Sequence, residues 1–106
     1  MAIMDLLRGP DINQGVEEYK NTPGAFLIDV RSPQEYASGH VPGSENIPVQ
    51  AFREIEELVE NKETPLFVYC LSGSRSGRVV RAFQTLGYTN VKNIGGVSAY
   101  RGELER

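Results

Sequence analysis

The sequence lacks tryptophan, contains one cysteine and one histidine, and carries more acidic than basic side chains. A single cysteine cannot form an internal disulfide, so the fold does not depend on an oxidising compartment. The chain has 14 Asp and Glu against 11 Lys and Arg, which gives a net charge of −3. Because phosphate binding needs a basic face, this balance argues against nucleic acid as a partner.

Long apolar runs are also missing. No segment approaches the roughly 20 apolar residues of a membrane-spanning helix, and residues 1–10 lack the cationic start and apolar stretch of a signal peptide. We therefore expect a cytoplasmic protein with no membrane contact. The remaining composition, 40% hydrophobic and 24% charged in 106 residues, is typical of a globular domain with its own hydrophobic core. We expect one domain over residues 1–106.

Strand-like and helical patterns alternate along the chain. The segments 25–30 and 66–69 are apolar on both faces, as expected of buried parallel strands. Shorter strands are expected at 3–7, 45–48 and 90–94. Helices are expected at 16–20 behind a cap at Asp11 or Asn13, at 33–38, at 49–61, from the loop after Cys70 to Gly87, and from Val97 onward. This alternation predicts an α/β fold with a parallel sheet.

The clearest helix boundary lies directly after the strand expected at 25–30. Ser32 stands at the N-cap, Pro33 at the first helical position, and Glu35 where a capping box requires an acid. Gly39 ends this short helix. The sequence therefore predicts a helix start in which Ser32 and Glu35 bond each other's backbone.

The chemistry of the chain is concentrated in Val68-Tyr69-Cys70-Leu71-Ser72-Gly73-Ser74-Arg75-Ser76-Gly77-Arg78. A strand stops at the only cysteine, and a small-residue loop leads into a helix. The N–H groups of such a loop converge on one point, which the helix dipole makes electropositive. A thiol placed there is pushed toward the nucleophilic thiolate. We predict a Cys70 nucleophile in a cradle made by Leu71, Ser72, Gly73, Ser74 and Arg75.

Residues at two other strand ends are candidates for the pocket rim, because ligands of parallel α/β sheets bind outside the carboxyl ends of strands. These candidates are Asp29, Arg31 and Gly96. A structural role is favoured for Asp29 and Arg31, with Arg31 paired to a helix acid such as Glu35. His40 is expected to pack or to bond locally rather than to act as a base.

Four residues in and directly after the loop are each open to more than one role. Gly73 is expected to supply a left-handed backbone conformation. Ser74 and Ser76 are expected to cap the following helix rather than to contact substrate. Arg75 opposes the helix dipole, which is explained either by an anionic ligand or by a role in shaping the loop.

Three segments together closely resemble rhodanese-type sulfurtransferases. They are Leu27 to Tyr36 continued by Gly39 to Pro48, Val68-Tyr69-Cys70-x-x-Gly73-x-Arg75-Ser76, and Asn93-Ile94-Gly95-Gly96-Val97-x-x-Tyr100. Tyr100 stands where that family usually has tryptophan. The resemblance covers the chain from about Ala25 to Leu104 and implies a five-stranded parallel sheet flanked by helices on both faces.

The resemblance also implies a covalent, two-step mechanism. The Cys70 thiolate takes the sulfane sulfur of thiosulfate or another donor, and sulfite leaves. The N–H groups of residues 71–75 hold the resulting persulfide, which cyanide, a thiol or a protein then removes. No metal or organic cofactor is implied, and the family's equivalent of Arg75 can bond loop carbonyls without touching substrate.

Loop length distinguishes this chemistry from phosphate hydrolysis. Four residues separate Cys70 from Arg75, whereas phosphatases with a Cys/Arg loop place one more between the two. Tyr69 also stands where protein tyrosine phosphatases have histidine. A phosphatase or arsenate reductase of the same fold is therefore disfavoured. A persulfide relay or interaction module serving a partner protein stays open, because Arg75 is the only basic residue of the loop.

Overall fold

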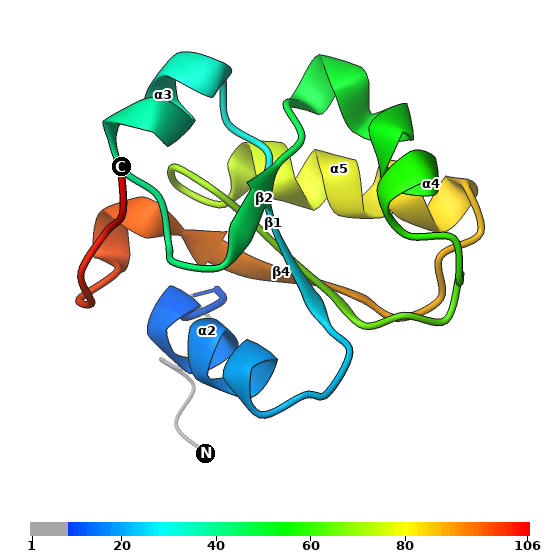
Figure 1. Cartoon of the computed structure of the whole chain (residues 1–106), viewed down its shortest axis with the longest axis horizontal. Coiled ribbons are helices and arrows are strands. Elements are labelled where there is room, and N and C mark those ends of the chain that lie inside the picture. The colour runs from blue at the N-terminus through cyan, green and yellow to red at the C-terminus, as the bar shows by residue number, and fades with distance from the viewer. Residues whose placement is uncertain (1–8) are drawn as a thin grey trace.

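The computed structural model describes residues 9–106, and its elements follow one another as alternating helices and strands (Figure 1). They are α2 (Ile12–Lys20), β1 (Phe26–Asp29), α3 (Pro33–Ser38), β2 (Ser44–Asn46), the 3₁₀ segment η1 (Val49–Glu54), α4 (Ile55–Leu58), β3 (Leu66–Cys70), α5 (Ser74–Thr85), β4 (Val91–Gly96) and the 3₁₀ turn η2 (Val97–Ala99).

The strands form one parallel sheet with the order β2-β1-β3-β4. β3 is buried along its whole length, as its apolar sequence predicts. The predicted strands at 25–30, 45–48, 66–69 and 90–94 are confirmed, with ends that shift by a few residues. The described part of the chain holds four strands, and the fifth was predicted at 3–7, which lies outside the described residues.

Helices cover both faces of the sheet, as the sequence predicted. Figure 1 shows α2 on one side and α4 and α5 on the other. Alternate residues of the strands divide the core accordingly. Leu27, Phe67 and Tyr69 pack on the α2 side with Ile12 and Ile94. The other cluster contains Ile28, Val30, Val68, Cys70, Val79 and Phe83, so the cysteine side chain lies on the same face as α5.

The predicted start of α3 is confirmed in detail. The backbone N–H of Glu35 donates to Ser32 Oγ at 3.2 Å, and the N–H of Ser32 donates to Glu35 Oε1 at 3.1 Å. Pro33 occupies the first turn, where its missing N–H costs nothing. This reciprocal bonding fixes the Glu35 side chain beside the start of its own helix.

The helix predicted over 49–61 is wrong in type and length. A 3₁₀ segment with a kink at Ala51 leads into a single α-helical turn that ends at Leu58. Val59 is extended and only 4% exposed. The buried hydroxyl of Tyr88 lies within hydrogen-bond distance of the carbonyls of Ile55 and Val59. A distant residue therefore satisfies the end of the turn, and the local amphipathic pattern does not reveal it.

The helix predicted from Val97 onward is also wrong. Only the short turn η2 forms, and Tyr100 is extended. The segment that follows returns to the chain near α3, where the backbones of His40 and Glu105 exchange hydrogen bonds of 2.9 and 2.8 Å in an antiparallel bridge. Pairing with His40 replaces helix formation at this end. None of the helices among residues 9–106 has the length and apolar character needed to cross a bilayer.

Candidate active site

Cys70 lies at the carboxyl end of β3, directly beneath the start of α5. Its residue surface is fully buried, and two donors approach its sulfur. The Gly73 N–H lies 3.0 Å from Sγ, and Ser76 Oγ lies 3.4 Å away. Gly73 adopts φ +104°, the left-handed conformation predicted for it, and is the N-cap of α5. The loop therefore turns its polar groups inward onto one sulfur atom.

Hydrogen bonds determine the direction of the pKa shift at Cys70. Burial raises the pKa of the thiol, because the charged form loses its hydration. The Ser76 hydroxyl and the N–H groups of Ser76, Gly73 and Ser72 lower it by a larger total amount. The pKa of Cys70 consequently lies below its ordinary value, which increases the thiolate fraction near neutral pH.

The end of β4 lies against the Cys70 loop, as predicted for the carboxyl ends of neighbouring parallel strands. Cys70 is paired with Gly96 in the sheet register. A Cβ atom on Gly96 would lie 2.2 Å from the Leu71 carbonyl oxygen and 2.5 Å from the Ser72 Cα. Only glycine fits at this approach. Gly96 therefore sets how closely the Cys70 loop lies on the sheet.

Ser76 has a different role from the helix cap that its position suggested. No side chain caps α5. The buried Ser76 hydroxyl instead lies 3.1 Å from the Gly73 carbonyl and 2.8 Å from Asn93 Oδ1, in addition to its approach to Cys70 Sγ. A hydroxyl has one proton, so these acceptors compete, and the charged thiolate is the strongest of them. The capping expected of Ser74 is absent as well.

Asn93 is a site residue that the sequence analysis missed. Its amide nitrogen donates to the Gly73 carbonyl at 3.1 Å, and its Oδ1 accepts from the Gly95 N–H at 3.0 Å. The register between β3 and β4 shifts immediately after Asn93. Such irregularities redirect side chains beside active sites. Strands rarely contain asparagine, so its presence in a predicted strand was the signal that could have identified Asn93 as a site residue.

Arg75 pairs with an acidic side chain that the sequence analysis did not assign to it. Its guanidinium forms a two-pronged ion pair with Glu35, with Nη1–Oε1 at 2.8 Å and Nη2–Oε2 at 3.0 Å. Both side chains are 31% exposed. The hydrogen bond from Arg75 is the main reason that the pKa of Glu35 falls to about 2. The pair is therefore fully ionised at neutral pH and ties α3 to the Cys70 loop.

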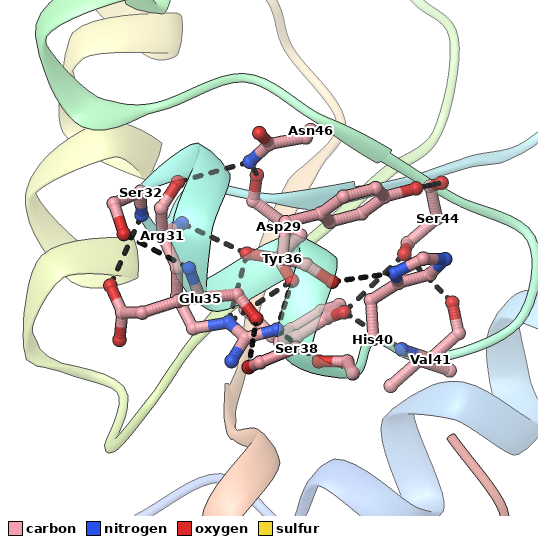
Figure 2. A network of polar contacts seen from close by, with 12 residues as sticks. Asp29, Arg31, Ser32, Glu35, Tyr36, Ser38, His40, Val41, Ser44 and Asn46 are labelled. Atoms are coloured by element: carbon pink, nitrogen blue, oxygen red, sulfur yellow. Dashed lines mark hydrogen bonds and ion pairs between the residues drawn. The ribbon is translucent and has the colours of Figure 1, made fainter. Parts of the chain in front are cut away.

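Asp29 and Arg31 form a buried ion pair, so the pairing predicted between Arg31 and Glu35 is wrong (Figure 2). Arg31 Nη2 lies 2.7 Å from Asp29 Oδ2, and Nε lies 3.1 Å from both carboxylate oxygens. Arg31 also donates to the Gly39 carbonyl. Asp29 is 0% and Arg31 4% exposed. These side chains hold the segment after β1 together, in the structural role that the sequence favoured.

His40 packs locally, as expected. Its ring stacks on Tyr36, with centroids 3.7 Å apart and planes 2° from parallel. Its Nδ1 lies 2.8 Å from the Tyr36 carbonyl, which can only accept, so Nδ1 carries the proton (Figure 2). Tyr100 is partly buried against the core cluster on the α2 side of the sheet.

A groove of about 770 Å³ lies away from Cys70, between the start of α2 and β4. Asp11, Gly15 and Arg101 belong to its wall, and it reaches Asn93 without including Cys70. The converging donors around the sulfur therefore mark the candidate site better than cavity size does. Among residues 9–106, no group of three or more His, Cys, Asp or Glu side chains is arranged to hold a metal ion.

Comparison with known proteins points to one family. The family model for the rhodanese-like domain matches residues 13–103. Thiosulfate sulfurtransferase PspE of Escherichia coli K12 is 41% identical over 71 residues, covering 66% of this chain and 68% of that protein. A solved structure described as a rhodanese with anions from E. coli superposes with a TM-score of 0.72 at 34% identity, covering 77% of this chain and 98% of the other.

A longer relative contains a similar segment. The adenylyltransferase and sulfurtransferase uba4 of Ogataea parapolymorpha is 32% identical over 96 residues, which cover 90% of this chain. The matched region is only 25% of that protein. The similarity thus concerns one part of a larger molecule.

Proposed function

The chain belongs to the rhodanese-like domain family, and we propose that it is a sulfurtransferase in which Cys70 carries the transferred sulfur as a persulfide. The similarity to PspE and to the E. coli rhodanese structure supports thiosulfate or a related sulfane-sulfur compound as the donor. The observation that carries the role of Cys70 is the cradle itself. Donors from Gly73 and Ser76 converge on Sγ and lower its pKa.

The donor half-reaction transfers one sulfur atom to Cys70. The thiolate attacks the outer sulfur of thiosulfate, a new S–S bond forms to Sγ, and the old S–S bond breaks with its electron pair leaving on sulfite. The persulfide that results carries a negative charge on its outer sulfur. The loop N–H groups that stabilise the thiolate are suited to hold this charge as well.

The acceptor half-reaction regenerates the thiolate. Cyanide, a small thiol or a protein thiol attacks the outer persulfide sulfur, and the bond between the two sulfurs of the persulfide breaks. The electron pair returns to Sγ, where the hydrogen bonds from Gly73 and Ser76 stabilise it. A thiolate with a lowered pKa is a good leaving group, so the same contacts serve both halves of the cycle.

Thiocyanate formation from thiosulfate and cyanide tests the proposal. The wild-type protein should turn over, and Cys70→Ser should lose the activity completely while keeping the fold, as shown by its thermal unfolding. Gln84→Ala, an exposed change on α5, is the matched control and should leave the rate unchanged. Equal rates for the wild type and Cys70→Ser would contradict the proposal.

A persulfide relay is the second candidate, and it is favoured because the one basic residue of the loop, Arg75, is paired with Glu35. In that role the chain would accept sulfur from a partner protein and turn over thiosulfate slowly. Loading of Cys70 by a persulfide-carrying cysteine desulfurase, compared with loading by thiosulfate, separates the two candidates. Much faster loading by the protein donor would support the relay.

Hydrolysis of a phosphate ester is the reaction expected of the disfavoured phosphatase alternative. With four residues between Cys70 and Arg75, the loop is shorter than in phosphatases of this type. We expect no hydrolysis of an aryl phosphate above the rate of Cys70→Ser. Measurable hydrolysis by the wild type would favour that alternative.

A further inference from the structure

The charge of Arg75 is already neutralised within the protein. It is the only basic residue of the loop 71–76, and both of its terminal nitrogens bond the two carboxylate oxygens of Glu35. Arg75 lies in the first turn of α5, two residues after Gly73, whose N–H donates to Cys70 Sγ. A cation that could attract an anionic donor is thus offset by a fixed anion.

Glu35 is held in this position independently of Arg75. Its Oε1 also accepts the Ser32 N–H in the capping box, which orients the carboxylate at the start of α3. The pair therefore does not depend on two flexible surface chains meeting by chance. Arg75 meets an acceptor whose geometry is set in advance, and the net charge of the pair is zero.

Donors of different charge experience this arrangement differently. Thiosulfate brings two negative charges toward a site that already carries the Cys70 thiolate. Without an unpaired guanidinium, the loop offers only N–H and hydroxyl dipoles to offset the repulsion. Leu71, the residue after Cys70, is 45% exposed and can contact an apolar group on an organic donor. Both features disfavour a small dianion and suit a donor with one negative charge and an apolar group.

We propose that Glu35 determines donor specificity: by pairing with Arg75 it makes the Cys70 site prefer singly charged organic sulfane-sulfur donors over the thiosulfate dianion. Thiosulfonates, R–SO₂–S⁻, and alkyl persulfides, R–S–S⁻, are such donors. This inference rests on the proposed sulfur transfer through Cys70. It assigns Glu35 a role in donor choice in addition to its capping of α3.

The transfer step balances for these donors. The Cys70 thiolate attacks the outer sulfur of R–SO₂–S⁻, and a bond forms between Sγ and that sulfur. The bond from the outer sulfur to the sulfonyl sulfur breaks, and its electron pair leaves on the sulfinate R–SO₂⁻. Two negative charges are present before and after the step, and no oxidant, reductant or proton is required.

Thiosulfate and methanethiosulfonate form a matched pair of probes, because both present an outer sulfur on a sulfonyl-type group and differ by one charge. The kcat/KM of each is measured for the wild type and for Glu35→Gln. Glutamine keeps the capping acceptor for Ser32 and removes the charge. The ratio of thiosulfate to methanethiosulfonate activity should rise about tenfold in Glu35→Gln as Arg75 is unmasked. An unchanged ratio would overturn the inference.

Glu18→Gln is the matched control, since it removes one partner of the exposed Glu18–Lys92 ion pair with the same change in net charge. Its donor ratio should equal that of the wild type. Ionic strength gives a readout that a purely structural role of Glu35 would not change. Thiosulfate activity should fall more steeply with added salt in Glu35→Gln than in the wild type.

The outcomes separate the two proposals. If no donor loads Cys70 in the wild type, the proposed sulfurtransferase function fails. If the wild type loads but Glu35→Gln and Glu18→Gln give the same donor ratio, only the role of Glu35 fails. If Glu35→Gln does not fold, the salt dependence of the two donors in the wild type still tests the role of Glu35. In the wild type, a much steeper fall of thiosulfate activity than of methanethiosulfonate activity with added salt would show an unpaired cation and contradict the inference.

Discussion

The segment 29–40 and the loop 70–76 both contain buried polar groups, and they use them in opposite ways. In the first, Asp29 and Arg31 face each other and the backbone, so their charges cancel locally. In the second, Gly73 and Ser76 both approach the Cys70 sulfur and favour a negative charge on it. The first arrangement supports the fold and the second supports reactivity. Glu35 and Arg75 join the two regions.

This difference implies that stability and reactivity can be changed separately. Across residues 9–106, every buried side-chain nitrogen and oxygen has a hydrogen-bond partner. Substitution of Asp29 or Arg31 alone therefore leaves an unpaired buried charge, whereas substitution around Cys70 changes the energy of one ionised sulfur.

Asp29→Asn should cause the largest loss of stability. Arg31 then remains buried without a counter-charge, and breaking such a pair lowers the free energy of unfolding by about 3–5 kcal/mol. Urea unfolding measures the loss. The double variant Asp29→Asn/Arg31→Gln should be less damaged than Asp29→Asn, because the residual charge is gone. A loss below about 1 kcal/mol would mean that this pair behaves like a surface ion pair.

Ser76→Ala should change reactivity more than stability. Removing its hydroxyl takes away the largest contribution that lowers the pKa of Cys70, so that pKa should rise. Alkylation of Cys70 by iodoacetamide, followed as a function of pH, should show its midpoint displaced to higher pH. Below that midpoint, Ser76→Ala should therefore be alkylated more slowly than the wild type at the same pH. Ser98→Ala, an exposed serine, is the matched control and should show the wild-type midpoint.

Glu35→Gln should have the smallest effect on stability. The pair is partly exposed, and such pairs contribute about 1 kcal/mol or less. Because Arg75 lowers the pKa of Glu35 from 4.5 to about 2, the stabilisation is complete above pH 4.5 and is lost as the pH falls through about 2. The wild-type advantage over Glu35→Gln in urea unfolding should therefore disappear across this range. A constant difference down to pH 2 would contradict the assignment.

Local signals predicted most of the scaffold. The capping box at Ser32, the apolar strands and the cysteine at a strand end all depend on residues close in sequence, and each is found. The helix over 49–61 fails because the buried Tyr88 hydroxyl satisfies the end of the turn at Leu58. The final helix fails because the chain pairs with His40 instead.

The partners within the site were harder to predict because the fold brings them together from distant positions. Glu35 and Arg75 are 40 residues apart. Asn93 reaches the Gly73 carbonyl where the register between β3 and β4 shifts. The preference of serine for helix caps does not reveal that the Ser76 hydroxyl contacts Cys70 Sγ and Asn93 Oδ1. Sequence reasoning located the thiol and the loop N–H groups around it, but not the side-chain contacts of Ser76 and Asn93.

Intact-protein mass spectrometry shows whether Cys70 carries a transferred sulfur atom. After incubation with thiosulfate or methanethiosulfonate and removal of the donor, the wild type should gain the mass of one sulfur atom, located at Cys70 by peptide mapping. Cyanide should remove that mass and release an equal amount of thiocyanate. A wild-type protein that gains no sulfur from either donor, or a Cys70→Ser variant that gains as much, would contradict the account.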